Sequence, residues 1–334
     1  MRVVLAATAF FLLIGALPAS AAAPPAPETL CQVTDPRVTE LSGLVSDGTH
    51  WYAINDGGTK VQVFVLDRSC AVQKVLSAST DPYDVEDLAR AADGTLWLSD
   101  TGDNSNKRST VALLELKPSG GGVTLHRLTY PDGPHDTEAL LLDRSGTLYL
   151  VTKDILGDAK VYRPNGPLAT PGPTPLEQVG TVTIRSTDTK GGPVGAFGSV
   201  LVTGGATSTD GTVVALRTYT DAYLYAAPDG DVAAALKRTP VRIPLAGEKQ
   251  GEALAFEPDG TLLSAGEGVG QPVRAVKNAA SLVSAAGAEA AGAPQGEAAA
   301  GSSPGGGVPA LPAAVLAVVV VFGGWLLVRK LRRR

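Results

Sequence analysis

Acidic side chains recur at one position of a repeated sequence. Five stretches each lead from a short apolar run to an Asp-Gly or Ser-Gly turn and then to a β-rich strand. Carboxylates that are brought together at low dielectric stay ionised only where a cation or hydrogen-bond donors compensate them. Eight residues before the turn glycine, four of the five stretches carry a glutamate and one a threonine: Glu40, Glu86, Glu138, Thr203 and Glu252.

Several kinds of compensation fit this acidic set. A hard cation such as Ca²⁺ takes several oxygen ligands of this type. Alternatively, the chain's own Lys153 and Arg217 neutralise the carboxylates, or each glutamate accepts backbone N–H groups and holds neighbouring repeats together. Direct use in ligand binding or catalysis is a further alternative. The candidate metal ligands are Glu40, Glu86, Glu138, Glu252, Asp100 and Asp103.

A second group of oxygen-bearing side chains follows the β-rich strands of the first three repeats. Its glycine-flanked loops suit calcium, but Asp, Asn and Gly are also the ordinary residues of turns. The order Asp100-x-x-Asp103-Asn104 lacks the pattern of an EF-hand loop. Turn formation therefore remains the alternative to a metal site for this group, which comprises Asn55, Asp56, Asp100, Asp103, Asn104 and Asp154.

Histidine offers one candidate for proton transfer. The chain has three histidines and no HExxH pattern, which argues against zinc catalysis. His135 directly precedes Asp136 and lies three residues before Glu138, so it is a candidate general base near neutral pH, with an exposed loop histidine as the alternative. No GxSxG elbow supports a serine hydrolase.

The repeats themselves predict the fold that positions these residues. The turn glycines Gly48, Gly94, Gly146, Gly211 and Gly260 follow one another at 46, 52, 65 and 49 residues, the period of a four-stranded propeller blade. We therefore expect an all-β β-propeller of five blades, with six as the alternative. Residues 29–34 would supply the last outer strand and close the ring.

The first strand of each blade lines the centre of a propeller, so equivalent positions form rings around the axis. The glutamates should therefore gather at one mouth of the central channel. Asp84 and Asp136, each two residues before a glutamate, would extend the acidic layer. The cationic side chains Lys153 and Arg217 would lie near the repeat that carries Thr203. The predicted channel-mouth ring comprises Glu40, Glu86, Glu138, Glu252, Asp84, Asp136, Lys153 and Arg217.

The two cysteines, Cys31 and Cys70, predict one disulfide. An even pair in an exported chain is most simply oxidised, and neither cysteine has CxxC spacing or a neighbouring histidine. With Cys31 on the closing strand and Cys70 at the outer end of the first blade, the bond would lock the ring.

The two ends of the chain predict export and membrane attachment. Residues 1–23 have the pattern of a signal peptide, and the uncharged residues 308–328, followed by the basic tail 329–334, have that of a transmembrane helix with its C-terminus inside. Between them we expect a propeller ectodomain at 24–276 and an Ala/Gly/Ser-rich stalk at 277–307. The partner of the helix is the cytoplasmic membrane.

The net charge of the ectodomain disfavours some classes of binding partner. The formal net charge is −5, but six of the 28 basic residues lie in the signal peptide and the basic tail, whereas all 33 acidic residues lie between these segments. The exported part therefore carries about −11, which disfavours binding to nucleic acid. An acidic surface suits cationic partners, metal ions or solubility.

Several stretches resemble a family of exported, actinobacterial-type β-propellers, and more distantly the esterase-like phytase and gluconolactonase-type propellers. The resemblance covers roughly residues 35–270 and implies the propeller fold. Of the site residues of the two distant enzyme families, only the recurring Glu-x-Leu position can be matched in this chain. It is carried by ELSGL at 40–44, AINDGG at 53–58, DVEDLA at 84–89, DTGDN at 100–104, TYPDGPHDTEALLLD at 129–143, ALRTYTDAYLY at 215–225 and QGEALAF at 250–256.

These patterns favour a cell-surface binding module whose acidic mouth recognises an extracellular protein or small molecule. The alternative is a divalent-metal-dependent extracellular hydrolase of phosphoesters, esters or lactones, with the glutamates as ligands and His135 or a carboxylate as base. An architectural envelope component is a third alternative. Ca²⁺ is the cofactor that the acidic set suits best.

Overall fold

The structure is a computed structural model that describes residues 24–119 and 122–283. Within these ranges the chain forms β-strands, a 3-10 helix (η1), a short α-helix (α1) and further helical residues at 279–283. The elements are β1 (Glu28–Val33), β2 (Leu41–Ser46), β3 (Trp51–Asn55), β4 (Val61–Leu66), β5 (Val72–Ala78), β6 (Val85–Arg90), β7 (Leu96–Asp100), β8 (Val111–Leu116), β9 (Val123–Thr129), β10 (Thr137–Leu142), β11 (Leu148–Thr152), β12 (Asp158–Pro164), β13 (Thr174–Thr183), η1 (Gly195–Ser199), β14 (Val202–Thr207), β15 (Val213–Thr218), β16 (Asp221–Ala226), α1 (Val232–Ala235), β17 (Val241–Pro244), β18 (Gly251–Phe256), β19 (Leu262–Gly266) and β20 (Gln271–Val276).

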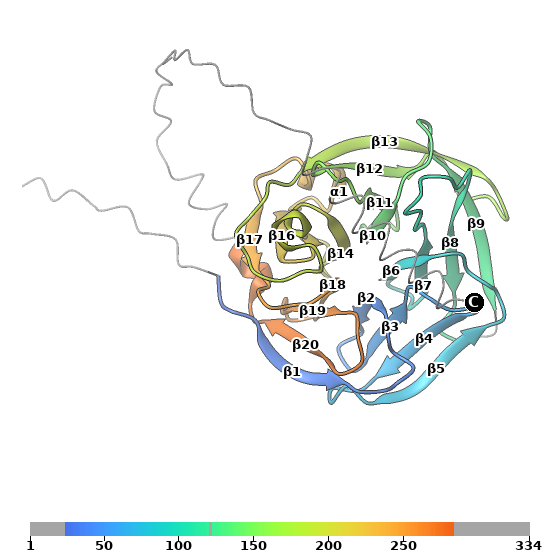
Figure 1. The fold of residues 1–334 in the computed structure, drawn as a ribbon. Helices are drawn as coiled ribbons and strands as arrows, with labels where there is room; N and C mark the ends of the chain where they lie inside the picture. The colour runs from blue at the N-terminus through green and yellow to red at the C-terminus, as the bar shows by residue number, and fades with distance from the viewer. Residues whose placement is uncertain (1–23, 120–121, 284–334) are drawn as a thin grey trace, which may run out of the picture. The chain divides into compact units, whose positions relative to one another are not determined.

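The strands pair as antiparallel meanders. Two sheets have the orders β2-β3-β4-β5 and β14-β15-β16-β17, and a third has the order β1-β20-β19-β18. The remaining strands form one eight-stranded sheet, in which the meanders β6 to β9 and β10 to β13 are joined by a short parallel pairing of β9 with β13. The sheets surround a common centre, as in a propeller (Figure 1).

The centre is lined by the first strand of each meander. In sequence order β2, β6, β10, β14 and β18 each contact the next, and β18 contacts β2. The turn glycines of the repeats follow these strands in the left-handed region, for example Gly94 at φ 85° and Gly146 at φ 87°, where a residue with a Cβ is strained. The repeats found in the sequence are therefore the inner hairpins of the meanders.

Hydrophobic cores lie between neighbouring sheets. Trp51 and Phe64 of the first meander, for example, pack in one cluster with Leu263 and Val273 of the last one. The alternation of apolar residues along the strands supplies one such layer on each side of every sheet. The ring is thus held together by face-to-face packing of side chains.

At the very centre, one carboxylate joins three inner strands. Asp87 of β6 is completely buried, and its Oδ1 accepts the N–H of Leu88. Its Oδ2 accepts the N–H of Leu140 in β10 at 2.8 Å and of Gly205 in β14 at 3.1 Å. Because β6, β10 and β14 belong to three meanders, this side chain fixes their separation at the axis.

Hydroxyl groups continue the connections from one inner strand to the next. Ser42 donates to the carbonyl of Glu86 at 2.5 Å, and Thr203 donates to the carbonyl of Gly251 at 2.8 Å. Glycine makes this approach possible, since a Cβ at Gly43 would lie 2.7 Å from the backbone nitrogen of Leu88. The inner strands are therefore in direct backbone contact around the centre.

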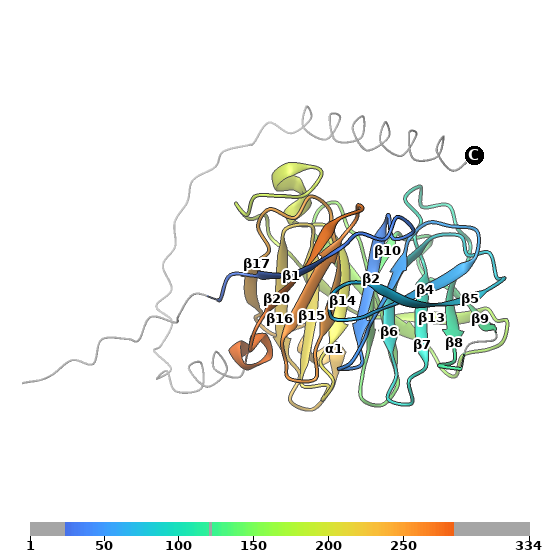
Figure 2. The same cartoon turned by 90° about the horizontal axis from the view of Figure 1, so that it is seen from below.

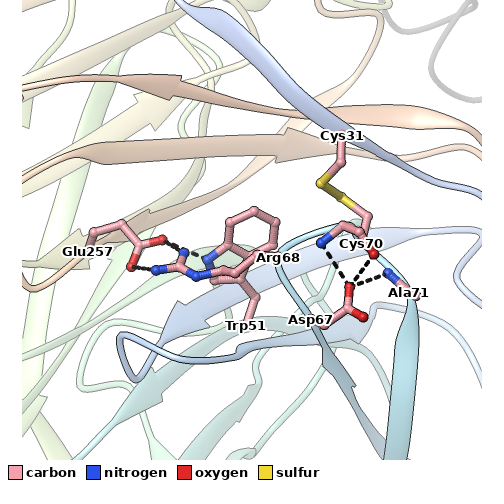
Figure 3. Close-up of a disulfide and its surroundings, with 8 residues drawn as sticks. Cys31, Trp51, Asp67, Arg68, Cys70, Ala71 and Glu257 are labelled. Atoms are coloured by element: carbon pink, nitrogen blue, oxygen red, sulfur yellow. Dashed lines mark hydrogen bonds and ion pairs between the residues drawn. A yellow bond between two sulfur atoms is a disulfide. The ribbon is translucent and has the colours of Figure 1, made fainter.

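The ring closes through the first strand, as the sequence predicts. β1 pairs antiparallel with β20, which places an N-terminal strand at the outer edge of the last meander. The predicted disulfide is confirmed: Cys31 of β1 is bonded to Cys70 in the β4–β5 turn, with the two Cα atoms 5.8 Å apart (Figure 3). Beside it, Glu257 accepts the Trp51 Nε1–H at 2.7 Å and pairs with Arg68, so the last meander is tied to the first.

The loops lie on two opposite faces. The mouth face is the face at which the inner strands begin; its loops span residues 34–40, 56–60, 79–84, 101–110, 130–136, 153–157, 184–201, 219–220, 245–250 and 267–270. The turn face carries the Asp-Gly and Ser-Gly hairpins at the other ends of the inner strands, and also α1. Figure 2 shows the ring from the side, with α1 at the turn face.

The described chain extends past the predicted end of the propeller at Val276. Ala279 and Val283 are buried in the cluster between the fourth and last meanders. The predicted signal peptide, most of the stalk, the transmembrane helix and the basic tail lie outside the described residues. Among the helices of the described part, none combines the length and the apolar character needed to cross a membrane.

We expect Asp87→Ala to lower the free energy of unfolding by roughly 3 to 5 kcal/mol, because three buried N–H groups lose their acceptor. Asp87→Asn should lose less, since one amide oxygen can still accept from Leu140 and Gly205. Urea unfolding measures both values. Asp93→Asn, in the exposed turn of the same meander, is the matched control; an equal loss in the control would show that Asp87 has no special role.

Candidate functional site

A β-bulge near the start of each inner strand positions the acidic side chains. The pairing register shifts between Val85 and Asp87 in β6, and equivalent shifts occur in the other four inner strands. A bulged residue leaves the regular alternation of side chains and is turned in a new direction. The residues at the five bulges are Ser42, Glu86, Glu138, Thr203 and Glu252.

This register places Glu40 differently from the repeat alignment. Ser42, not Glu40, is the bulged residue of β2, and Glu40 lies two residues earlier, at the position that Asp84 and Asp136 hold in their repeats. The reason is the hairpin after β2, where the turn glycine Gly48 follows the last paired residue, Ser46, by two residues, whereas Gly94 follows Arg90 by four. Counting back from the turn glycine therefore shifts Glu40 by two residues.

Three carboxylates of the predicted ring meet at the mouth. Glu86, Asp136 and Glu138 each offer an oxygen within 4.8 Å of the others. They are 4%, 9% and 3% exposed. Two oxygens bound to one Ca²⁺ at about 2.3 to 2.6 Å can be at most about 5 Å apart, so one ion can bind all three carboxylates. We call these three residues the acidic triad.

One cation is paired with the acidic triad. Lys153, which follows β11, donates from Nζ to Glu138 Oε1 at 2.7 Å, and its side chain is 10% exposed. Burial alone would lower the pKa of Lys153, but Glu138 and other nearby acids raise it well above its ordinary value, so the ammonium stays charged. The ring of Tyr219, 5.3 Å from Nζ, packs on the other side.

Burial shifts the titration of the triad. It raises the pKa of Glu86 well above the ordinary value, and the charges of Glu138 and Asp84 raise it further. Burial also raises the pKa of Glu138 and of Asp136, with Lys153 acting against it in both cases. With all three acids ionised, the triad and Lys153 carry a net charge of −2 in a water-poor site, a charge that a divalent cation would neutralise.

Glu252 interacts with a further carboxyl group, that of Glu267, which the repeats do not reveal. Burial raises the pKa of Glu267, which follows β19, to about 9, and Glu252 and Glu40 add to the shift. Glu267 therefore holds a proton at neutral pH, and its carboxyl group and that of Glu252 affect each other's pKa. No recurrent position marks Glu267 in the sequence, and only its place after an inner hairpin could have indicated it.

Asp100 and Asp103 support the mouth through the backbone. Asp100 Oδ1 accepts the N–H of Asp84 at 2.9 Å, and the N–H of Asp103 donates to Asp136 Oδ1 at 2.7 Å. Asp103 Oδ2 accepts two N–H groups of its own loop. Gly102 lies between them, and a Cβ there would collide with the Glu86 carboxylate. These aspartates thus orient loops next to the acidic triad.

The remaining members of the second oxygen group form turns. Asn55 accepts the N–H of Glu40 and donates to the carbonyl of Arg37, and Asp154 accepts the N–H groups of Leu156 and Asp158. Asp56 is buried, and its N–H donates to the carbonyl of Glu40. Asn104 is half-buried in the β7–β8 loop.

Arg217 is buried near the mouth but is paired elsewhere. Its Nη2 donates to Glu248 at 2.6 Å, and its Nη1 donates to the carbonyls of Ala253 and Ala265. Ser264 donates to the other oxygen of Glu248 at 2.6 Å. Arg217 therefore links β15 to β18 and β19, and among the described residues Lys153 is the cation paired with the acidic triad. No recurrent position in the sequence marks Glu248, the partner of Arg217.

His135 belongs to a separate polar cluster. Its Nε2 lies 2.9 Å from Asp132 Oδ1 and 2.9 Å from the Tyr162 hydroxyl, and Lys160 also donates to Asp132. The Tyr130 ring contacts the His135 ring edge-on at 5.1 Å. Asp136, the next residue, instead points into the acidic triad. The structure thus places the His135 side chain next to β12, the third strand of its meander.

The fold and these contacts define an all-β protein of the propeller class with a buried acidic centre. No family model matches the chain, and no curated protein matches its sequence. Among solved structures it is similar to a putative gluconolactonase, with 16% identity, a TM-score of 0.40, and coverage of 69% of this chain and 71% of that one.

Two further solved structures are similar to the same extent. One is the PQQ-bound aldose sugar dehydrogenase from Streptomyces coelicolor, with 11% identity, a TM-score of 0.41, and coverage of 76% of this chain and 99% of that one. The other is a gluconolactonase from Xanthomonas campestris, with 12% identity, a TM-score of 0.40, and coverage of 78% and 98%. At such identities and TM-scores, these likenesses carry no argument about chemistry.

We expect the protein in EDTA to lose stability as the pH rises from about 5 to about 9. The folded-state pKa values of Glu86 and Glu267 lie above the ordinary value of 4.5, so the folded protein holds protons that the unfolded chain has released. Each such group lowers the free energy of unfolding by up to about 1.4 kcal/mol per pH unit. Chemical unfolding across this pH range measures the slope, and a rise in stability over the same range would contradict these assignments.

Proposed function

We propose that this protein is a divalent-cation-binding propeller and that the acidic triad holds a cation such as Ca²⁺ at its mouth. The observation that carries the proposal is the Glu86 carboxylate. Its residue is 96% buried, and its carboxylate adjoins those of Asp136 and Glu138. Three carboxylates that meet in a buried site are costly unless a cation or protons compensate them.

The donor set fits a hard cation. All three ligand groups are carboxylates, the ligand type that Ca²⁺ and Mg²⁺ prefer, and neither histidine nor cysteine belongs to the triad. Three carboxylates supply three to six of the six to eight oxygens that Ca²⁺ takes, so positions toward the solvent stay available. The cation would then bind an oxygen atom of an extracellular ligand, which is the role we assign to the mouth.

The test is cation binding by the full-length protein. Isothermal titration with Ca²⁺, Mg²⁺ and Mn²⁺ should show one site, and saturation at a hundred times Kd should raise the free energy of unfolding by about 2.7 kcal/mol. Glu86→Gln should weaken the affinity at least tenfold, because a carboxamide is a poorer ligand than a carboxylate.

Glu177→Gln is the matched control, since Glu177 lies on the outer strand β13 and is paired with the exposed Arg163. It should leave affinity unchanged. Absence of binding for every cation, or an equal loss in Glu86→Gln and the control, would rule out the triad as the site.

One observation favours hydrolysis as a second function. The protonated Glu267 lies in the same charged centre as the acidic triad, because the charges of both Lys153 and Glu138 shift its pKa. A cation bound by the triad would polarise an ester or lactone carbonyl and lower the pKa of a water molecule. When water adds to the carbonyl carbon and the C–O bond breaks, Glu267 would protonate the leaving oxygen.

For this second function we expect cation-dependent turnover of simple esters or lactones. Glu267→Gln should lower kcat about a hundredfold, a typical contribution of general acid catalysis, while cation affinity stays within threefold. Turnover measured at pH 6 to 9 for both proteins tests this. A variant as active as the wild type would exclude Glu267 from the reaction and leave cation binding as the function.

We further infer that the ring has five blades, counting the eight-stranded sheet as two, and that the propeller is displayed outside the cytoplasmic membrane. The order of the meanders supports the first inference. The signal-peptide pattern at 1–23, the apolar residues 308–328 and the disulfide support the second.

A further inference from the structure

The outer edge of the ring holds a histidine that takes no part in the acidic mouth. His126 lies in the middle of β9, the fourth strand of its meander, and is 6% exposed. β9 runs beside β13 of the next meander (Figure 1). Residues 165–173, which lead from β12 into β13, lie against β9 through hydrogen bonds to His126 and Arg127. We call these nine residues the rim loop.

Both ring nitrogens of His126 face oxygen atoms. Nδ1 lies 3.0 Å from the carbonyl oxygen of Ala169 in the rim loop, and Nε2 lies 3.3 Å from Glu115 Oε2 in β8. A carbonyl oxygen can only accept a hydrogen bond, so Nδ1 carries a hydrogen. A carboxylate also can only accept, so Nε2 carries one as well. The imidazole that fits these contacts is therefore the doubly protonated cation.

The charge of Glu115 is maintained by a second cation. Lys117 Nζ lies 2.5 Å from Glu115 Oε1, and the hydrogen bonds from Lys117 and His126 lower the pKa of Glu115. Among the described residues, no other charged side chain is paired with His126; its further neighbours, the Trp97 ring at 5.7 Å and the Thr170 hydroxyl at 3.3 Å, are uncharged. Glu115 thus remains an acceptor in the pH range in which histidine side chains exchange a proton.

Loss of one proton from His126 to water breaks one of its two contacts. If Nδ1 keeps its hydrogen, the lone pair of Nε2 faces the Glu115 carboxylate. If Nε2 keeps its hydrogen, the lone pair of Nδ1 faces the Ala169 carbonyl, and two facing acceptors leave both without a donor. The Thr170 hydroxyl can donate to Nδ1 instead, once the Ala169 carbonyl moves away. The neutral ring therefore favours a displaced rim loop.

Few other contacts hold the rim loop on β9. Most of its residues are exposed, and Leu168 packs on the core between the second and third meanders. The carbonyl of Pro171 accepts the Arg127 N–H at 2.7 Å. A segment with so few buried contacts opens more readily than the strands beneath it. One titrating contact can therefore decide whether the loop is closed.

We propose that His126 is a pH-dependent switch between the second and third meanders. Its cationic form holds the rim loop on β9, and its neutral form releases the loop and uncovers the outer edge of β9 before Leu128. The uncovered edge presents the Arg127 N–H to an extended segment of a partner chain. Acidic surroundings close this edge and alkaline surroundings open it. The switch does not depend on a cation at the mouth.

Hydrogen exchange of the Arg127 amide tests the switch, because this N–H donates to the rim loop itself. Protection factors of the full-length protein, corrected for the intrinsic pH dependence of exchange, are compared at pH 5 and pH 8. The amide of Leu114, buried in β8 of the same meander, is the internal reference for changes in overall stability. We expect the ratio of Arg127 protection to Leu114 protection to fall about tenfold or more at pH 8.

Glu115→Gln distinguishes the switch from a purely structural contact. The glutamine amide can donate to Nε2 of the neutral ring, whose Nδ1–H still binds Ala169, so the loop should stay closed at both pH values. Lys117→Met removes the cation but keeps the carboxylate; it is the matched control and should show the wild-type fall. An unchanged ratio in the wild type overturns the inference. A Glu115→Gln protein that opens as the wild type does, or is open at both pH values, overturns it as well.

Discussion

The carboxylate of Asp87 sets the geometry on which the rest of the ring depends. It accepts N–H groups from β6, β10 and β14, so the inner strands of three meanders are held at one distance. A buried charge is unfavourable by itself, and burial indeed raises the pKa of Asp87. The carboxylate is stabilised there because three backbone N–H groups donate to it. These N–H groups come together only when the inner strands are correctly assembled.

The acidic mouth follows from the same assembly. Each inner strand starts with a bulge that turns one side chain toward the centre, and the five bulges are equivalent because the strands are. Where the bulged residue is Ser42 or Thr203, it binds the neighbouring backbone. Where it is Glu86 or Glu138, a charge is placed in a water-poor site. Unequal use of equivalent positions thus brings Glu86 and Glu138 together on neighbouring strands, whereas Glu252 lies on the strand between those of Thr203 and Ser42.

The sequence predicted the features that repeat or that lie at the ends of the chain. Glycine spacing revealed the inner hairpins, and the terminal strand and the cysteines revealed the closure and its disulfide. The roles of Glu267 and Asp87 were not predicted, because neither residue holds a recurrent acidic position. Their surroundings are formed by strands that are distant in sequence. Glu40 was misplaced by two residues because the turn glycine of the first hairpin follows the inner strand two residues sooner than in the second. Spacing along a chain cannot report such local differences in turn length.

Both ends of the described chain lie away from the mouth. β1 starts beside the end of β20, and the last described residues, with Ala280 bonded to Gly260, lie at the turn face. A propeller attached through either terminus would therefore face its surroundings with the acidic centre foremost. The way the ring closes thus also decides where the described chain begins: the closing strand that completes the last sheet has its first residue at the turn face, opposite the mouth.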